Sequence, residues 1–273
     1  MNRPQRLRMA LIDLDGTLYR GDSAILGADA FVRRLRQQGV APVFFTNNAT
    51  RTPEQVCDKL AYFDIDASPS EVCTSAQAAA SYLIHRVPQG APVVYVGTGA
   101  LAVALKAEGY EPILADGAVL AGTAGQESGV KLAQAAVLGL DTTVNYLRLA
   151  EFCQVVSSLG WFVLTNADVR LPYGDAFWPG NGALGSFVTT ATGIQPMVTG
   201  KPSKGFVEYA CQRYGISPEE TVIIGDNLRT DVLAGLESGV YTIHVLTGVQ
   251  YVEFDAPHQP DEVHSSVAEL FLS

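Results

Sequence analysis

The sequence predicts an α/β protein with a mainly parallel sheet, into which a second, smaller α/β domain is inserted. Short apolar runs, typical of strands buried on both faces, alternate with helical segments along the 273 residues. Three of these runs end in polar residues, as parallel strands do when their carboxyl ends form a binding site. From Val93 the strand–helix pattern starts again, over a stretch long enough to bury a core of its own.

The first domain is predicted to be discontinuous. Its strands are expected over 9–12, 40–45, 221–224 and 241–246. Its helices are expected over 31–38, from Thr52, and over 76–84, 204–214 and 228–237, with a last one from Ser266. Glycines such as Gly39 and Gly239 mark helix ends, because they adopt the left-handed conformation at low cost.

The second domain is predicted between these halves. Strands are expected over 93–96, 135–141 and 162–165, with a weaker candidate over 119–121, and helices over 100–108 and 145–159. The glycine- and proline-rich stretch 172–185 predicts a loop that returns to the first domain. The expected boundaries are therefore 1–82 and 183–273 for the first domain, and 83–182 for the inserted one.

Composition excludes several classes of function. The net charge of −10 and the pI near 4.8 disfavour binding to a nucleic acid polymer or an anionic membrane. No apolar stretch reaches the roughly 20 residues needed to span a bilayer. The four cysteines show neither zinc-site spacing nor a disulfide pattern, which indicates reduced thiols and a cytoplasmic protein. In so acidic a chain, an anionic substrate requires a local positive centre such as a metal ion.

The strongest functional signal is a pair of acids after the first strand. Alternation along the strand places Asp13 and Asp15 on one side, where they repel each other unless a cation or a proton intervenes. Gly16 allows a sharp turn and brings backbone N–H groups close to a bound group. The alternative is a simple turn or helix cap, since Asp-Gly is a common turn dipeptide.

Other strands of the first domain also end in polar residues. Thr46 and Asn47 follow the second strand, Asp226 follows the strand over 221–224, and Lys201 precedes a helix. The carboxyl ends of parallel strands meet at one edge of a sheet, so these side chains are expected to converge. Taken singly, each has a bland reading: a polar strand cap, a turn acid or a surface lysine.

The run Asp13-Leu14-Asp15-Gly16-Thr17-Leu18 resembles the first signature of the haloacid dehalogenase (HAD) superfamily, which consists mostly of phosphohydrolases. Within it, the segments 46–48, 200–203 and 225–235 resemble those of NagD-type and p-nitrophenyl phosphatases. The resemblance implies a Rossmann-like HAD core, and it implies that the long segment between Asn47 and Lys201 is a C2-type cap. Residues 115–130 have no clear family counterpart and are expected to be an insertion.

The resemblance implies a role for each residue in phosphoryl transfer, which depends mainly on positioning and electrostatic stabilisation. Asp13 is the expected nucleophile and Asp15 the general acid and base, while Lys201, Thr46 and Asn47 hold charge and phosphoryl oxygens. Mg2+ is the expected cofactor, with ligands from Asp13, Asp226 and the Asp15 backbone carbonyl. Supporting contacts to the metal waters or to Lys201 are expected from Asp231 and Asn227. For Asp231 the alternative is charge complementation at a helix terminus.

Substrate contacts are the least constrained part of the prediction. They are expected from five residues: Gly16, Asn48, Arg51, Asn166 and Asp168. Ala167 stands where the family pattern has proline, so this loop departs from the pattern between its two polar residues. An ordinary strand-end turn explains Asn166 and Asp168 about as well.

The predicted activity is Mg2+-dependent hydrolysis of a small phosphorylated metabolite. Nucleotide, sugar, pyridoxal and glycolate phosphates all remain open as substrates. A dehalogenase or phosphonatase on the same scaffold is the first alternative, and Asp15 disfavours it because a halide needs no proton on leaving. A catalytically idle metal-binding module is the second, and the complete set of acids with Lys201 disfavours it. Family analogy further suggests a homodimer formed through the cap.

Overall fold

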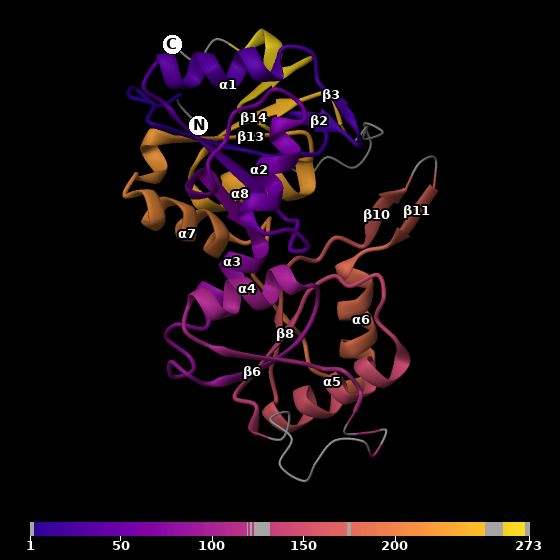
Figure 1. The fold of residues 1–273 in the computed structure, drawn as a ribbon. Helices are drawn as coiled ribbons and strands as arrows, with labels where there is room; N and C mark the ends of the chain where they lie inside the picture. The colour runs from indigo at the N-terminus through magenta and orange to yellow at the C-terminus, as the bar shows by residue number, and fades with distance from the viewer. Residues whose placement is uncertain are drawn as a thin grey trace. The chain divides into compact units, whose positions relative to one another are not determined.

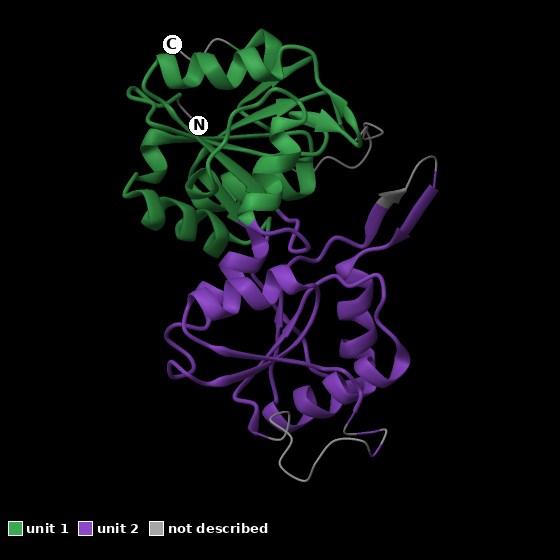
Figure 2. Ribbon diagram, in the orientation of Figure 1, with its two compact units in different colours: residues 1–46, 53–73, 201–273 green, residues 47–52, 74–200 purple. Residues whose placement is uncertain are grey.

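The computed structural model describes residues 3–118, 120, 122, 132–173, 176–248 and 259–270. The chain forms two compact units, coloured separately in Figure 2. Unit 1 comprises Met1–Thr46, Pro53–Cys73 and Lys201–Ser273, and unit 2 comprises Asn47–Thr52 and Thr74–Gly200. The predicted architecture, a parallel-sheet α/β core interrupted by a second α/β domain, is confirmed.

Unit 1 is built on a six-stranded sheet in the order β15-β14-β13-β1-β4-β5 (Figure 1). The strands are β1 (Met9–Ile12), β4 (Ala41–Thr46), β5 (Val72–Thr74), β13 (Thr221–Gly225), β14 (Tyr241–Val245) and β15 (Glu262–His264). β1 pairs in parallel with both β13 and β4, so it is a central strand. A short antiparallel pair, β2 (Tyr19–Arg20) and β3 (Ser23–Ala24), follows it.

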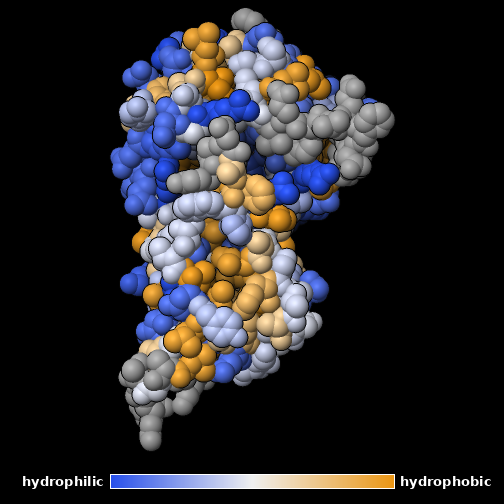
Figure 3. Space-filling model, turned by 90° about the vertical axis from the view of Figure 1, so that its right-hand side faces the viewer, coloured by the Kyte–Doolittle hydropathy of each residue, from blue (hydrophilic) through white to orange (hydrophobic). Residues whose placement is uncertain are grey.

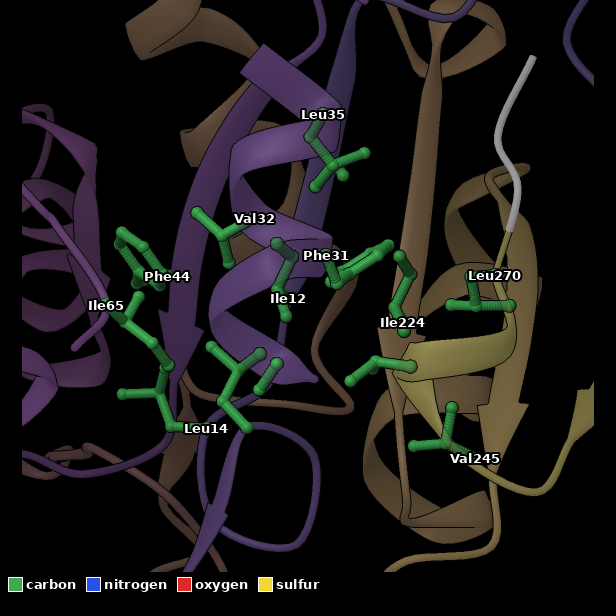
Figure 4. Close-up of a cluster of buried hydrophobic side chains, with 14 of the residues drawn as sticks. Ile12, Leu14, Phe31, Val32, Leu35, Phe44, Ile65, Ile224, Val245 and Leu270 are labelled. Carbon is green, nitrogen blue, oxygen red and sulfur yellow. The ribbon is translucent and has the colours of Figure 1, made fainter. Parts of the chain in front are cut away.

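Helices pack against this sheet, and each helix buries one of its own faces. They are α1 (Ala28–Gln37), α2 (Pro53–Ala61), α7 (Lys204–Tyr214) and α8 (Leu233–Ser238), the last preceded by a π-helical turn over Leu228–Val232. In α1 the apolar Phe31, Val32 and Leu35 recur at helical spacing and point into the core, where Figure 4 shows them beside Ile12 and Ile224. This buried layer fixes the ends of β1 and β13, which carry the predicted acids.

Unit 2 has its own five-stranded sheet in the order β12-β9-β8-β6-β7, with every neighbouring pair parallel. The strands are β6 (Pro92–Val96), β7 (Glu111–Leu114), β8 (Ala135–Leu138), β9 (Val163–Leu164) and β12 (Met197–Val198). Its helices are α3 (Ser75–Tyr82), α4 (Gly99–Ala107), α5 (Tyr146–Leu159) and α6 (Asn181–Thr192). Separate apolar clusters cover the two faces of the sheet, so unit 2 is a doubly wound domain in its own right.

The predicted domain boundaries at 83 and 182 differ from these units. Ala76, Ala79 and Ala80 of α3 pack with Val93 of β6 in one cluster, so α3 belongs to unit 2. At the other end, Val188 of α6 packs in the second cluster of that unit, and β12 pairs with β9. Side-chain packing therefore places the two ends at Thr74 and Gly200.

Several further elements depart from the sequence-based expectation. The stretch 172–185, predicted as a loop, instead contains part of a hairpin and the start of α6. The hairpin consists of β10 (Arg170–Tyr173) and β11 (Ala176–Pro179), and Figure 1 shows it standing out from the rest of unit 2. The edge strands of both sheets, β5, β7, β12 and β15, were not expected, and the final helix is only a 3-10 turn over Val267–Glu269. The candidate strand over 119–121 and most of the expected insertion at 115–130 lie outside the described residues.

The exposed apolar side chains, the cysteines and the helix lengths can be compared with what the composition indicated. Unit 2 exposes large apolar side chains on its hairpin and on α6, including Phe177, Trp178 and Phe187. Figure 3 shows apolar residues gathered on one face in the lower half of the view. All four cysteines are free thiols. Among the helices of the described residues, none combines the length and the apolar character that crossing a bilayer requires.

Candidate active site

The predicted acids of unit 1 lie at the carboxyl ends of neighbouring strands. Asp13 follows β1 and Asp226 follows β13, and the register pairs Ile12 with Ile224 just before them. The backbone N–H of Asp13 donates to the carbonyl oxygen of Ile224 at 2.9 Å, which continues the ladder by one residue. The end of the sheet therefore holds both acids in fixed positions, as the sequence predicted.

Lys201 connects this site to the end of β4 and to Asp231. Its Nζ donates to Asp13 Oδ1 at 2.5 Å, to Asp231 Oδ1 at 2.7 Å and to the carbonyl oxygen of Phe45 at 3.0 Å. Only 2% of Lys201 is exposed. Burial alone would lower the pKa of this ammonium, but the Asp13 and Asp231 carboxylates outweigh it and raise the pKa above its usual range. The lysine is a fixed buried cation, and the surface-lysine reading is wrong.

The Asp13 carboxyl is under opposing influences. Burial raises its pKa to about 6, Lys201 opposes this increase, and the nearby Asp231 adds to it. Asp15 is more exposed than Asp13. Partial burial raises the pKa of Asp15, against the lowering effect of the Lys59 ammonium and with a further increase from Asp13. The two acids thus share a region in which a neutral carboxyl group is stabilised.

Asp226 is almost completely buried in a cradle of glycines. A Cβ atom built on Gly16 would lie 2.5 Å from Asp226 Oδ2, and one on Gly248 would lie 1.9 Å from the same oxygen. Gly16 also has a φ of +92°, which L side chains rarely adopt. Both positions therefore require glycine so that the carboxylate and a group beside it have room.

Three carboxylates form a cluster with the geometry of a cation site. One oxygen each from Asp13, Asp226 and Asp231 lies within 4.8 Å of the others. Among the described residues, these three form the group of possible metal ligands. Oxygen ligands of this kind suit a hard divalent cation. The donor set fits Mg2+, with Lys201 balancing part of the negative charge.

Asp231 and Asn227 fill supporting positions. Besides accepting from Lys201, Asp231 accepts from the backbone N–H of Asn227 at 3.1 Å, while Asn227 Oδ1 accepts from the backbone N–H of Arg229 at 2.9 Å. A Cβ on Gly225 would lie 2.2 Å from Asp231 Cγ, so glycine is required there as well. Asp231 is held by specific contacts to Lys201, beyond what charge complementation at a helix terminus requires.

The polar residues after β4 divide between the two units. Thr46 is buried at the end of β4 in unit 1, whereas Asn47 and the residues up to Thr52 belong to unit 2. Asn48 Oδ1 accepts from both the backbone N–H and the hydroxyl of Thr50, at 2.7 Å each, which is an Asx turn. Arg51 is half-buried in the same segment.

Asn166 and Asp168, at the end of β9, both bind Asn47. Asn166 Nδ2 donates to the Asn47 carbonyl oxygen at 2.9 Å, and Asn47 Nδ2 donates to Asp168 Oδ2 at 3.1 Å. These contacts lie within unit 2. The two residues thus have a structural partner that neither sequence-based reading included.

Several residues at the site carried no sequence signal. Thr247 donates its hydroxyl to the carbonyl oxygen of Gly16 at 2.6 Å, and Arg20 donates to that of Gly248 at 3.0 Å. His244, to which the sequence assigned no role, places Nε2 at 2.9 Å from the Asp226 carbonyl oxygen, and burial lowers its pKa. The one available signal was position, since His244 lies in the strand that pairs with β13.

Comparison with known proteins agrees with this geometry. Residues 10–111 match the model of the haloacid dehalogenase-like hydrolases, and residues 198–270 match the related HAD-hydrolase-like model. The chain is 37% identical to the 5'-nucleotidase YutF of Bacillus subtilis over 88% of this chain and 87% of the relative. It is 40% identical to an acid sugar phosphatase of Staphylococcus aureus over 89% and 88%.

Solved structures show the same fold over nearly the whole chain. A glycerol phosphate phosphatase of Mycobacterium tuberculosis, crystallised with magnesium, matches with a TM-score of 0.83 and 31% identity over 96% of this chain and 76% of that one. NagD from Escherichia coli matches with a TM-score of 0.84 and 29% identity over 98% and 99%. The chain belongs to the haloacid dehalogenase-like hydrolase family. Within that family it is one of the NagD-like phosphatases.

Proposed function

We propose that this protein is a Mg2+-dependent phosphomonoester hydrolase that acts on a small phosphorylated metabolite through a phosphoryl group carried by Asp13. The observation that carries the proposal is the buried ammonium of Lys201, held between Asp13 and Asp231 beside the Asp226 carboxylate. The relatives named 5'-nucleotidase, acid sugar phosphatase and glycerol phosphate phosphatase support this class of substrate.

The cation would be held by Asp13 and Asp226, with the backbone carbonyl of Asp15 as a third ligand from the protein. Bound there, Mg2+ supplies charge neutralisation and orientation for phosphoryl oxygens. The glycine cradle around Asp226 and the support of Asp231 by Lys201 and Asn227 are consistent with this assignment. Magnesium in the crystallised glycerol phosphate phosphatase supports the choice of ion.

The chemistry of the protein residues can be written in two steps. In the first, a carboxylate oxygen of Asp13 attacks phosphorus, the bond to the leaving oxygen breaks, and Asp15 donates its proton to that oxygen. In the second, Asp15 removes a proton from water, which attacks the phosphorus of the aspartyl phosphate and releases inorganic phosphate and the Asp13 carboxylate. The raised pKa of Asp15 suits the first of these roles.

Other residues would bind rather than react. Lys201 keeps Asp13 ionised and offsets charge on the phosphoryl oxygens, to which Thr46 and Asn47 donate hydrogen bonds. The N–H of Gly16 donates to the Tyr19 carbonyl oxygen at 2.7 Å, so Gly16 would contribute room for the close approach of the phosphoryl group, and Asn48 and Arg51 would contact the remainder of the substrate. Asp15 continues to disfavour a dehalogenase, and the Lys201 cluster disfavours an idle metal-binding module, because a buried cation between two acids is costly to keep without a use.

The proposal is tested by metal removal. Purified protein is expected to release phosphate from p-nitrophenyl phosphate in the presence of Mg2+, to lose this activity in EDTA, and to regain it when Mg2+ is added in excess. A panel of nucleotide, sugar, glycerol, pyridoxal and glycolate phosphates then ranks substrates by kcat/KM. Full activity after exhaustive EDTA treatment would contradict the proposal.

The cradle of Asp226 gives a second expectation. Gly248→Ala introduces a Cβ at 1.9 Å from Asp226 Oδ2, so the carboxylate has to move. Because metal geometry is sensitive to ligand position, half-maximal activity is expected to require about 10- to 100-fold more Mg2+. Gly99→Ala is the matched control, since a Cβ there meets nothing within 4 Å. Equal Mg2+ requirements in the two variants would contradict the assignment of Asp226.

We also propose a cytoplasmic location, which the four free thiols support. Residues 74–200, with 47–52, are proposed to act as the cap that selects the substrate. The homodimer through this unit stays a prediction from the sequence.

A further inference from the structure

Asn47 is fastened inside unit 2 on both its backbone and its side chain. Its carbonyl oxygen accepts from Ser75 Oγ at 2.6 Å and from Asn166 Nδ2 at 2.9 Å. Its side-chain Nδ2 lies 3.1 and 3.4 Å from the two carboxylate oxygens of Asp168. A Cβ on Gly200 would lie 2.6 Å from Asn47 Oδ1, so the amide is also confined on its oxygen side.

The loop that holds Asn47 is itself braced by the start of α6. Asp168 donates its backbone N–H to Asn166 Oδ1 at 3.2 Å, and its carbonyl oxygen accepts from the N–H of Gly182 at 2.9 Å. A Cβ on Gly180 would lie 2.2 Å from the Asp168 carbonyl oxygen, and one on Gly182 would lie 2.3 Å from that of Ala167. The helix and the loop are therefore in backbone-to-backbone contact.

Asn181 lies at the centre of this brace and is 99% buried, with 1% of its surface exposed. Its Nδ2 donates to the carbonyl oxygen of Leu138 at 3.3 Å, to Thr165 Oγ1 at 3.0 Å and to the carbonyl oxygen of Asn166 at 3.0 Å. One amide group thereby joins the ends of β8 and β9 to the loop. Its Oδ1 has no hydrogen-bond partner among the described residues. A buried acceptor without a hydrogen bond costs free energy. The hydrogen bonds of the Asn181 side chain are therefore those that its Nδ2 donates.

We propose that Asn166, Asp168 and Asn181 are positioning residues for phosphoryl transfer: they orient Asn47 so that its amide donates to a phosphoryl oxygen. The inference rests on the proposed function, in which Asn47 binds that oxygen. An amide nitrogen carries two hydrogens, and holding one on Asp168 sets the direction of the other. A displacement of a catalytic group by about 1 Å costs about 100-fold in rate, so an amide held in a fixed direction gives a faster reaction than a mobile one. Asn166 and Asp168 then act through Asn47 rather than on the leaving group.

The first test exchanges the donor of Asn181 for an acceptor of the same size. Asn181→Asp places a carboxylate oxygen against the carbonyl oxygens of Leu138 and Asn166, which can only accept. Asn145→Asp is a matched control, because the hydrogen bond that the described residues show for the Asn145 side chain is made by Oδ1, as the cap of α5. We expect Asn181→Asp to lower kcat/KM by about 10- to 100-fold for p-nitrophenyl phosphate and for glycerol phosphate alike. Ki for inorganic phosphate, which has no leaving group, is expected to rise by a similar factor. Asn145→Asp is expected to stay within about twofold of wild type.

The second test does not depend on whether Asn181→Asp folds. Asn166→Ala and Asp168→Ala are each combined with Asn47→Ala in a double-mutant cycle. Once Asn47→Ala has removed the amide, we expect Asn166→Ala and Asp168→Ala to cause little further loss. Additive losses, or losses that vary with the leaving group while Ki for phosphate stays constant, would overturn the inference and leave the proposed function intact. Wild-type activity in Asn47→Ala alone would instead overturn the proposed role of Asn47 and the inference with it.

Discussion

Asp13→Asn is expected to lower kcat for p-nitrophenyl phosphate by about 10⁴-fold or more, because the amide cannot act as the nucleophile. The substitution keeps the size of the side chain, and Lys201 keeps its contacts with Asp231 and the Phe45 carbonyl oxygen. Thermal unfolding is therefore expected to change little. Initial rates in Mg2+ and the unfolding midpoint, measured on the same preparation, separate loss of chemistry from loss of fold.

Asp66→Asn is the control for Asp13→Asn. It makes the same chemical change at a side chain that is 96% exposed, and it should leave the rate within about twofold of wild type. A rate for Asp13→Asn within tenfold of wild type would remove Asp13 as the nucleophile.

Lys201→Met is expected to lower both the free energy of unfolding and the activity. It leaves Asp13 and Asp231 buried without their shared cation, which typically costs about 3–5 kcal/mol. Without Lys201, the pKa of Asp13 rises further above its value of about 6, so the folded variant binds more protons than the unfolded chain. Its stability deficit should therefore shrink as the pH falls from about 8 to about 5.5. Urea unfolding in EDTA measures this without any contribution from bound metal.

Lys204→Met provides the comparison for Lys201→Met. Lys204 pairs with Glu208 one turn along α7, with both side chains about half exposed, so its loss should cost no more than about 0.5 kcal/mol at any of these pH values. If the two lysine variants were equally stable, the Lys201 cluster would not be the charge centre of unit 1.

The sequence was sufficient to predict the reactive edge of unit 1. β1, β4 and β13 are short apolar runs with full or nearly full burial, and each is followed directly by a polar residue. In a parallel sheet such residues meet at one edge whatever the details of packing. The convergence of Asp13 and Asp226 followed from topology alone, whereas the expected role of Lys201 depended on the family resemblance.

The elements that escaped prediction are those in which tertiary contacts override local preference. Helix α6 contains Gly182 and Gly185, which disfavour a helix locally. The structure explains both glycines, because a Cβ on Gly182 would meet the Ala167 carbonyl oxygen at 2.3 Å and one on Gly185 would meet Leu164 Cδ2 at 2.8 Å. The edge strand β7 has exposed residues at both ends and half-buried ones between them, and it contains Pro112, so it has no buried apolar run to detect.

Hydrogen bonds between side chains that are far apart in the chain also could not be predicted from the sequence. Asn166 and Asp168 could be read as substrate contacts or as a turn, and only their positions relative to Asn47 show a third arrangement. Asn181 is 15 residues from Asn166 in a segment expected to be a loop. Polar partners separated by a hairpin, or by several helices and strands, leave no periodic signal.

The connections of unit 2 bear on how such enzymes diversify. The backbone passes between the units at four points, after residues 46, 52, 73 and 200. Three of these junctions lie next to one residue, since Asn47 begins the unit, Ser75 donates to the Asn47 backbone carbonyl oxygen, and Gly200 lies against the Asn47 side-chain amide. A recombined gene that supplies a different domain in this place has to join it to unit 1 at these chain crossings. New substrate preferences can then be acquired by exchange of a whole module, while the sheet that carries Asp13 is inherited unaltered.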